Sequence, residues 1–220
     1  MRSSLFSKLD EKAPVPLEIR AAYYPPIYTG IRAYTLQEFI EGLKKANGLS
    51  IFYHVFHPVF TSHIIPDDLH NDFAFWFRTQ LEEEDIADMV SDISGGEPRT
   101  VEDVRKDIIN ILSQFSASRV ARYPFSFLSC TPIVYDTGIR VETPGQLLDS
   151  VSTMTARGLV YHFVFRRVMG YTTKNDFSNW LESMGLNGPA NELSKIDPQT
   201  YTDETKLRRD ILLVLERWFL

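Results

Sequence analysis

The sequence predicts an all-α protein made of two tandem, homologous helical repeats of about five helices each, packed with pseudo-two-fold symmetry. The main observation is an internal duplication, in which a Tyr-His pair, an Asn-Asp-Phe triplet and a Trp occur twice in the same order. The two copies are Tyr53-His54, Asn71-Asp72-Phe73 and Trp76, and Tyr161-His162, Asn175-Asp176-Phe177 and Trp180. Thr29-Gly30-Ile31-Arg32 also recurs unchanged, as Thr137-Gly138-Ile139-Arg140. Because order, spacing and apolar pattern are kept together, the two halves are expected to share one fold.

Capping residues and apolar periodicity predict the helices of each copy. Thr35 and Glu38 have the spacing of a capping box, and Thr143 is followed by Pro144 at the first helical position. Residues 51–60 are apolar on nearly every side and show no period-two alternation, which favours a buried central helix over a strand. The expected helices begin near residues 35, 51, 71, 85 and 100, and near residues 143, 159, 175, 190 and 203.

The chain divides into an N-terminal arm of residues 1–23, a first repeat of residues 24–116, a connector of residues 117–136 and a second repeat of residues 137–220. Prolines at positions 14, 16, 25 and 26 argue against a helix at the start of the chain, so we expect an arm that lies on the core through its aromatic side chains. The connector places Phe125 and Phe127 where the arm lies in the first copy.

Composition excludes several classes of protein. The chain has 220 residues, 44% hydrophobic and 13% aromatic, which is typical of a globular protein. The net charge of -6 and the scattered basic residues argue against a nucleic-acid partner. No stretch approaches the roughly 20 apolar residues of a membrane span, and no apolar run follows the first residues as in a signal peptide. The single Cys130 suits a reducing cytoplasm.

The repeated pairs His54 with Asp72 and His162 with Asp176 are the main candidate site residues. Each pair has the chemistry of a general base with an orienting carboxylate. We favour a structural role, in which an Asn or Asp side chain at the start of the next helix accepts a hydrogen bond from a buried imidazole. The neighbouring Tyr53 and Tyr161 belong to the same motif.

Arg32 and Arg140 follow the repeated Thr-Gly turn. The turn is too short for a phosphate-binding loop and lacks the lysine of one, so we expect ion pairs with Asp107 and Asp210.

A metal site is the alternative reading of the histidines in the first copy. His54 and His57 are three residues apart, His63 and His70 follow, and Asp67 or Asp72 would complete the ligands. His57 is replaced by Phe165 in the second copy, and there is no CxxC or HExxH motif. We therefore assign no metal, no cofactor and no catalytic residue.

The Phe52-Tyr53-His54 and Asn71 to Trp76 motifs, with the turn at Ile196-Asp197-Pro198, resemble a prokaryotic family of uncharacterised proteins, a domain of unknown function. The resemblance covers nearly the whole chain and implies the duplicated repeat. The first copy departs from the pattern at this turn, where it has Ile93-Ser94-Gly95. No activity is carried over.

The sequence favours a non-enzymatic, cytoplasmic protein-interaction or regulatory module, whose partner is the same or another protein, because no complete catalytic set is present. One alternative is a sensor that binds a small molecule in a pocket between the repeats. The other is a metal-dependent enzyme that uses the histidines of the first copy. A pocket between the copies would favour the sensor, converging His and Asp side chains the enzyme, and an exposed apolar patch the interaction module.

Overall fold

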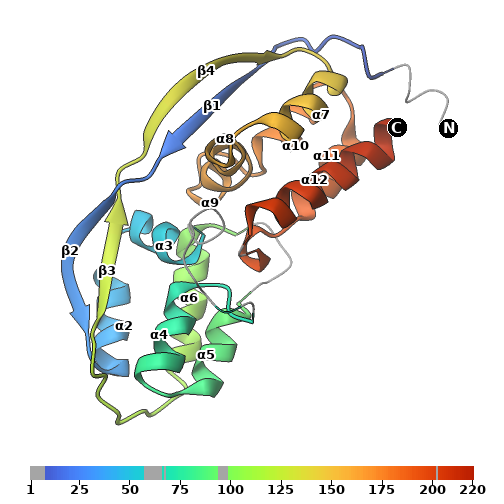
Figure 1. The fold of residues 1–220 in the computed structure, drawn as a ribbon. Helices are drawn as coiled ribbons and strands as arrows, with labels where there is room; N and C mark the ends of the chain where they lie inside the picture. The colour runs from blue at the N-terminus through green and yellow to red at the C-terminus, as the bar shows by residue number, and fades with distance from the viewer. Residues whose placement is uncertain (1–7, 57–65, 67, 94–98, 202) are drawn as a thin grey trace.

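Two helical lobes lie one after the other along a curved, two-stranded β-ribbon (Figure 1). The computed structural model describes residues 8–56, 66, 68–93, 99–201 and 203–220. The presence of strands makes the prediction of an all-α protein built from helical repeats wrong, because each repeat contributes two strands in addition to its helices. The fold is mixed α/β with antiparallel pairing.

The strands are exchanged between the two repeats. Strand β1 (Leu17–Tyr23), from the start of the chain, pairs with β4 (Ile133–Val141), which leads into the helices of the second lobe. Strand β3 (Phe125–Cys130), from the segment between the repeats, pairs with β2 (Pro26–Ala33), which leads into the helices of the first lobe. We count the arm with the first repeat and the connector with the second. Each lobe therefore contains one strand of its own repeat and one strand from the other.

The segments expected to form an arm and a connector contain the two exchanged strands. Their prolines lie near strand ends, as Pro25 between β1 and β2 and Pro132 between β3 and β4, where a missing N–H breaks no ladder. In β3 the side chains of Phe125, Phe127 and Ser129 are buried, and those between them are half-buried. This period-two alternation is the signal for a strand, and the proline-based prediction did not use it.

The helices follow in the same order in the two lobes. The first lobe contains α2 (Leu36–Lys45), α3 (Gly48–Val55), α4 (Asp72–Gln80), α5 (Glu84–Ser91) and α6 (Val101–Leu112). The second lobe contains α7 (Pro144–Thr153), α8 (Ala156–Val160), the π-helix η2 (Tyr161–Phe165), α9 (Arg166–Val168), α10 (Asp176–Ser183), α11 (Asn187–Lys195), the 3₁₀-helix η3 (Pro198–Thr200) and α12 (Glu204–Phe219). Side chains cap the helix starts as predicted, with Thr35, Asn71, Thr143 and Asn175 accepting from backbone N–H groups.

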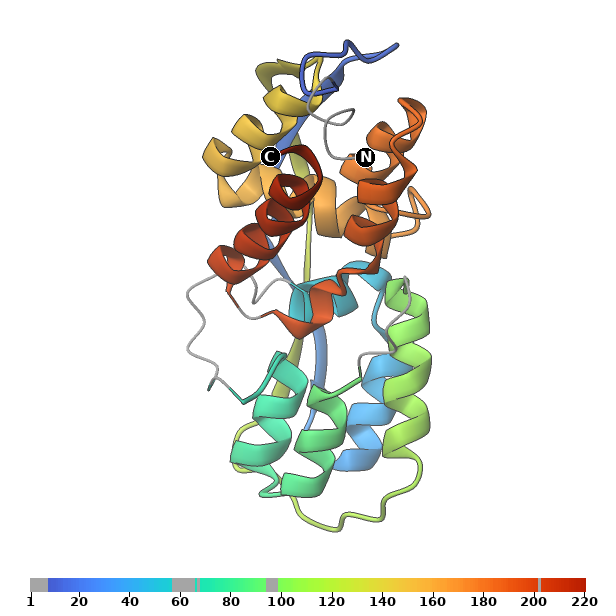
Figure 2. The ribbon, with the colours of Figure 1, turned by 90° about the vertical axis from the view of Figure 1, so that its right-hand side faces the viewer.

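Aromatic side chains join the two lobes at the middle of the molecule. The rings of Phe52 in α3 and Phe165 in η2 lie 5.0 Å apart, and Tyr24, between β1 and β2, lies 5.0 and 5.1 Å from them. Figure 2 shows α3 between the helices of the two lobes, with the ribbon behind both. The predicted central helix is therefore buried over residues 51–55, whereas residues 57–60 of that prediction lie outside the described part.

None of the helices in the described residues is long and apolar enough to cross a membrane.

The exchanged strands predict that neither repeat folds without the other. A fragment of residues 1–116 would lack β3, and a fragment of residues 117–220 would lack β1, so each would expose a buried face and an unpaired strand edge. Expressed alone, neither fragment should show a cooperative melt by circular dichroism, whereas co-expressed fragments should purify as a 1:1 complex. Cooperative, native-like folding of either fragment alone would contradict the strand exchange.

Candidate functional site

Each histidine of the repeated motif is hydrogen-bonded to the aspartate that opens the next helix. His54 Nδ1 lies 2.9 Å from Asp72 Oδ2, and His162 Nδ1 lies 2.7 Å from Asp176 Oδ2. Both imidazoles are buried, with 3% of each residue exposed. The contact predicted between the Tyr-His motif and the Asn-Asp motif is therefore present in both lobes.

The second nitrogen of each imidazole accepts a hydrogen bond from the exchanged strand. The backbone N–H of Leu128 in β3 donates to His54 Nε2 at 2.8 Å, and that of Arg20 in β1 donates to His162 Nε2 at 2.8 Å. Since Nε2 accepts, the ring proton is on Nδ1, where it is donated to the aspartate. No lone pair of either ring is left to take a proton from a substrate, so this arrangement suits a structural link and not a general base.

Other side chains also bind the exchanged strands, at equivalent positions of the two lobes. The hydroxyl groups of Thr29 and Thr137 donate to the carbonyl oxygens of Phe127 and Ile19. The indole N–H groups of Trp76 and Trp180 donate to the carbonyl oxygens of Tyr123 and Val15. Thus the His, Thr and Trp of the repeated motifs all bind the backbone of the segment exchanged between the copies.

The tyrosines and arginines of the motif have different surroundings. The rings of Tyr53 and Tyr161 lie edge-on to the neighbouring imidazoles, and burial, followed by the charge of Asp72, raises the pKa of Tyr53. Arg140 forms an ion pair with Glu18.

The prediction that Arg32 and Arg140 pair with Asp107 and Asp210 is wrong. Asp107 instead binds Arg99, and Asp210 accepts from the Tyr201 hydroxyl and pairs with Arg209.

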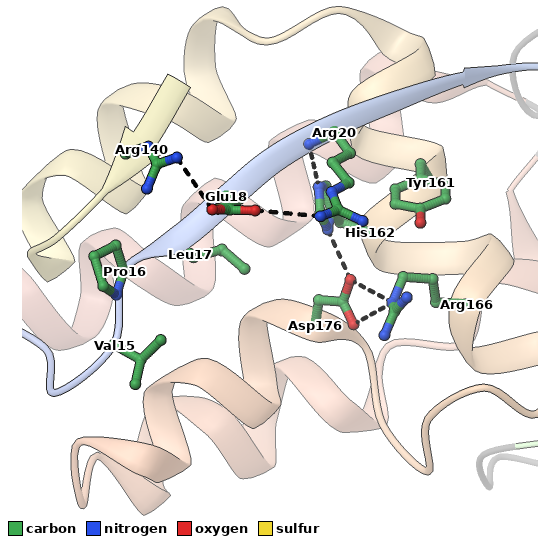
Figure 3. Close-up of a pocket in the computed structure, with 10 residues that line it drawn as sticks. All are labelled: Val15, Pro16, Leu17, Glu18, Arg20, Arg140, Tyr161, His162, Arg166 and Asp176. Carbon is green, nitrogen blue, oxygen red and sulfur yellow. Dashed lines mark hydrogen bonds and ion pairs between the residues drawn. The ribbon is translucent and has the colours of Figure 1, made fainter. Parts of the chain in front are cut away.

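A cavity of about 500 Å³ lies beside the His162 pair in the second lobe. Its wall consists of Val15, Pro16, Leu17, Glu18, Arg20, Arg140, Tyr161, His162, Arg166 and Asp176 (Figure 3). The exchanged strand β1 forms one side, and η2 with the starts of α9 and α10 forms the other. The cavity therefore lies between a strand of the first repeat and helices of the second.

Charged groups of both signs line this cavity. The Glu18 carboxylate binds Arg20 and Arg140, each at 3.2 Å, and Arg166 Nε donates to Asp176 at 2.9 Å. Burial opposes the charge of Arg166, but Asp176 outweighs it and raises the pKa of Arg166. Each arginine thus uses part of its five donors within the protein, and the remaining N–H groups can bind a ligand.

The exchanged strand of the first lobe has no charged side chain at the positions equivalent to Leu17–Arg20. Phe125 stands where the second lobe has Leu17, and its ring lies 4.8 Å from that of His54. Ser126 and Leu128 stand where the second lobe has Glu18 and Arg20. Sequence reasoning missed Glu18, Arg20 and Arg166. A signal was present, because these charged residues occur in one copy only.

The metal site that the sequence offers as an alternative falls mostly outside the described residues. Of the proposed ligands, His57, His63 and Asp67 lie outside the described residues, and His70 is bonded to Ser91 through its ring Nδ1 and its backbone N–H. Within the described part of the chain, no three His, Cys, Asp or Glu side chains gather as metal ligands. Burial raises the pKa of the Cys130 thiol to about 12, so this thiol is not a nucleophile near neutral pH.

The structural role of the imidazole predicts a loss of stability when it is removed. His54→Ala leaves a cavity and deprives both the Leu128 N–H and Asp72 of a partner, so it should lower the free energy of unfolding by about 2–4 kcal/mol. Asp72→Asn keeps an oxygen acceptor for the imidazole, so it should lower the free energy of unfolding by less than His54→Ala does. Urea unfolding followed by fluorescence measures both changes. Unchanged stability of His54→Ala would contradict the structural role.

Comparison with known proteins adds a family but no activity. The structure of OrfY from Thermoproteus tenax is similar to this one, with a TM-score of 0.90 and 43% sequence identity, over 96% of this chain and 98% of that chain. A search of curated proteins finds no match. Residues 14–216 match a family described as a family of unknown function (DUF5752). Because the match spans nearly the whole chain, the protein belongs to the DUF5752 family.

Proposed function

We propose that this protein is a non-enzymatic regulatory module that binds a small anionic ligand in the cavity beside His162. The observation that carries the proposal is the set of Arg20, Arg140 and Arg166 around one cavity of about 500 Å³. This volume is in the range of small-molecule sites, which run from about 300 to 1,000 Å³.

The chemistry of the wall favours an anion that also carries hydroxyl groups. Guanidinium groups bind carboxylate and phosphate through paired N–H donors. The carboxylates of Glu18 and Asp176, already oriented by arginines, are acceptors for ligand hydroxyl groups. A sugar acid or a sugar phosphate combines both features, which makes a sugar-like anion the expected class of ligand.

A non-enzymatic role fits the hydrogen bonding of the one histidine in this wall. His162 lines the cavity, but its Nε2 accepts from Arg20 N–H and its Nδ1 is bonded to Asp176. The same pair occurs in the first lobe, packed under Phe125. A pair made alike in two lobes whose exchanged strands differ in charge is better explained by folding than by catalysis.

Binding in this cavity would act on the link between the repeats. Arg20 belongs to β1, which comes from the first repeat, whereas Arg166 belongs to the second. A ligand that contacts both would stabilise the exchanged strand in place, by an amount that grows with its concentration relative to its Kd. We propose that the protein works in the cytoplasm, where an unpaired cysteine such as Cys130 is typical, and that its family is prokaryotic.

The arginines of the cavity provide the test. In a thermal-shift screen of sugar phosphates, sugar acids and dicarboxylates, at least one compound should raise the melting temperature of the protein. Arg20→Ala and Arg166→Ala should each weaken its binding about tenfold or more, measured by calorimetry, since a charged hydrogen bond is worth about 1.5–3 kcal/mol.

Arg32→Ala is the matched control, because Arg32 is the equivalent of Arg140 in the first lobe and lies outside the cavity wall. Its affinity should equal that of the wild type. Binding that survives both cavity variants, or that is lost in Arg32→Ala, would refute the site.

Self-association through the ribbon is a second candidate function, favoured by apolar side chains exposed where its two halves meet. Tyr23, Ile27, Tyr28, Ile133 and Val134 are exposed around this point. Each sheet of the described chain has two strands, so each strand has an unpaired edge, and a second copy would present matching edges and apolar groups.

If the ribbon joins two copies, Ile133→Glu should shift the mass measured by light scattering from dimer to monomer. Val120→Glu places the same charge at another exposed apolar position, in the segment between the repeats, and should leave the mass unchanged. A wild-type protein that remains a monomer at about 100 μM, a concentration that detects micromolar association, would exclude this candidate.

A further inference from the structure

A second cavity, of about 420 Å³, lies between the lobes and away from the one described above. One side is Arg99 and Thr100, which lead into α6 of the first lobe. The other side is Arg167 of α9 and the following loop, with Tyr171, Thr172 and Thr173. The two sides meet at Gly48 of α3. A Cβ atom at Gly48 would lie 3.2 Å from Val101 of α6 and 3.8 Å from Met169, which follows α9.

Arg167 is the unusual group in this wall. It is a cation with 3% of its surface exposed, and its Nη1 donates to the carbonyl oxygen of Ile196 at 2.9 Å. Its Nε is buried and has no hydrogen-bond partner. A buried donor without an acceptor is destabilising, the more so when the group is charged. Because Arg167 also lines the cavity, an anion bound there would lie beside this buried cation and stabilise its charge.

The electrostatics of the wall favour an anion. Burial lowers the pKa of Arg167, and the charge of Asp197 opposes part of this shift. Arg99 is paired with Asp107 and donates to the carbonyl oxygen of Ile93, which holds its side chain in place. Among the described residues that line the cavity there is no carboxylate; Asp107, which pairs with Arg99, and Asp197, which acts on Arg167, do not line it.

Hydroxyl groups complete the donor set. The hydroxyl of Thr172 donates to the carbonyl oxygen of Lys174, and that of Thr100 donates to Asp103. Thr173 and Tyr171 are exposed, and within the described part of the chain their hydroxyl groups make no hydrogen bond. The first N–H groups of α6 are already used by its capping box, so the site rests on the side chains and not on the helix terminus.

We propose that this cavity between the lobes binds a phosphoryl group, whose oxygens accept from the guanidinium groups of Arg167 and Arg99 and from the hydroxyl of Thr173. Arginine with hydroxyl donors is a common arrangement around phosphate. The volume leaves room for the organic part of a phosphate monoester beside the phosphoryl group. Because the ligand would contact both lobes, binding holds α6 and α9 together.

The experiment titrates the full-length protein with inorganic phosphate and with glycerol 3-phosphate by calorimetry. Both probes should bind if the phosphoryl group alone is recognised, and tighter binding of the ester would assign the remaining volume to an organic group. Arg167→Lys keeps the charge but loses the planar set of donors, and should weaken both affinities at least tenfold. Thr173→Val, at an exposed position, should weaken them about threefold, which corresponds to about 0.7 kcal/mol.

Arg32→Ala, at an arginine that lines neither cavity, is the control and should leave both affinities unchanged. Circular dichroism melts establish that each variant is folded. If Arg167→Lys does not fold, Thr173→Val and Arg99→Gln decide, and both should weaken binding. No heat with either probe at concentrations up to about 10 mM, which would place Kd above the millimolar range, overturns the proposal. Equal affinity in the folded Arg167 and Thr173 variants overturns it as well, as does loss of binding in Arg32→Ala.

Discussion

The hydrogen bond from the exchanged strand to a buried imidazole is the interaction on which the rest of this structure depends. In each lobe the ring accepts from the strand of the other repeat and donates to the aspartate that opens the next helix. One side chain thus fixes a strand and a helix start that are far apart in the sequence. Removing it would leave the N–H of the exchanged strand without its acceptor, which costs about 1–3 kcal/mol for a buried group, and would take one partner from the aspartate. This requirement explains why the Tyr-His and Asn-Asp motifs recur together: the two motifs form a single contact.

Strand exchange makes the two repeats one folding unit, and it also forms one wall of the cavity beside His162. The wall that holds Arg20 comes from the first repeat, and the wall that holds Arg166 comes from the second. The cavity between the lobes likewise combines Arg99 of one repeat with Arg167 of the other. Neither site would exist in an isolated repeat. A ligand in either cavity therefore acts on the contact between the copies, which is the simplest physical route from binding to regulation.

The sequence predicts what is local and misses what is not. Helix starts such as Thr35 and Asn175 were predicted because a cap and its N–H partner lie within three residues. The contact between His54 and Asp72 was predicted because both copies repeat it. The strands were missed because β1 pairs with β4, more than a hundred residues away, and because the local period-two alternation in β3 was not used. The ion pairs predicted for Arg32 and Arg140 were wrong for the same reason. Glu18, the partner of Arg140, lies in the exchanged strand β1 and is close to Arg140 only because that strand pairs with β4.

The two lobes have diverged in a way that separates packing from binding. In the first lobe Ser50 donates to the Leu128 carbonyl oxygen of the exchanged strand, and Phe125 packs against His54. In the second lobe Gly158 stands in place of Ser50, and a Cβ atom at Gly158 would lie 3.5 Å from the Arg20 carbonyl oxygen. The smaller Leu17 stands in place of Phe125. The second lobe thus lacks counterparts of the Ser50 hydrogen bond and of the Phe125 ring contact, and it has a polar cavity beside His162. A lobe that gives up packing at one place while retaining the His, Thr and Trp contacts that fix the strand is what selection for a binding site would produce.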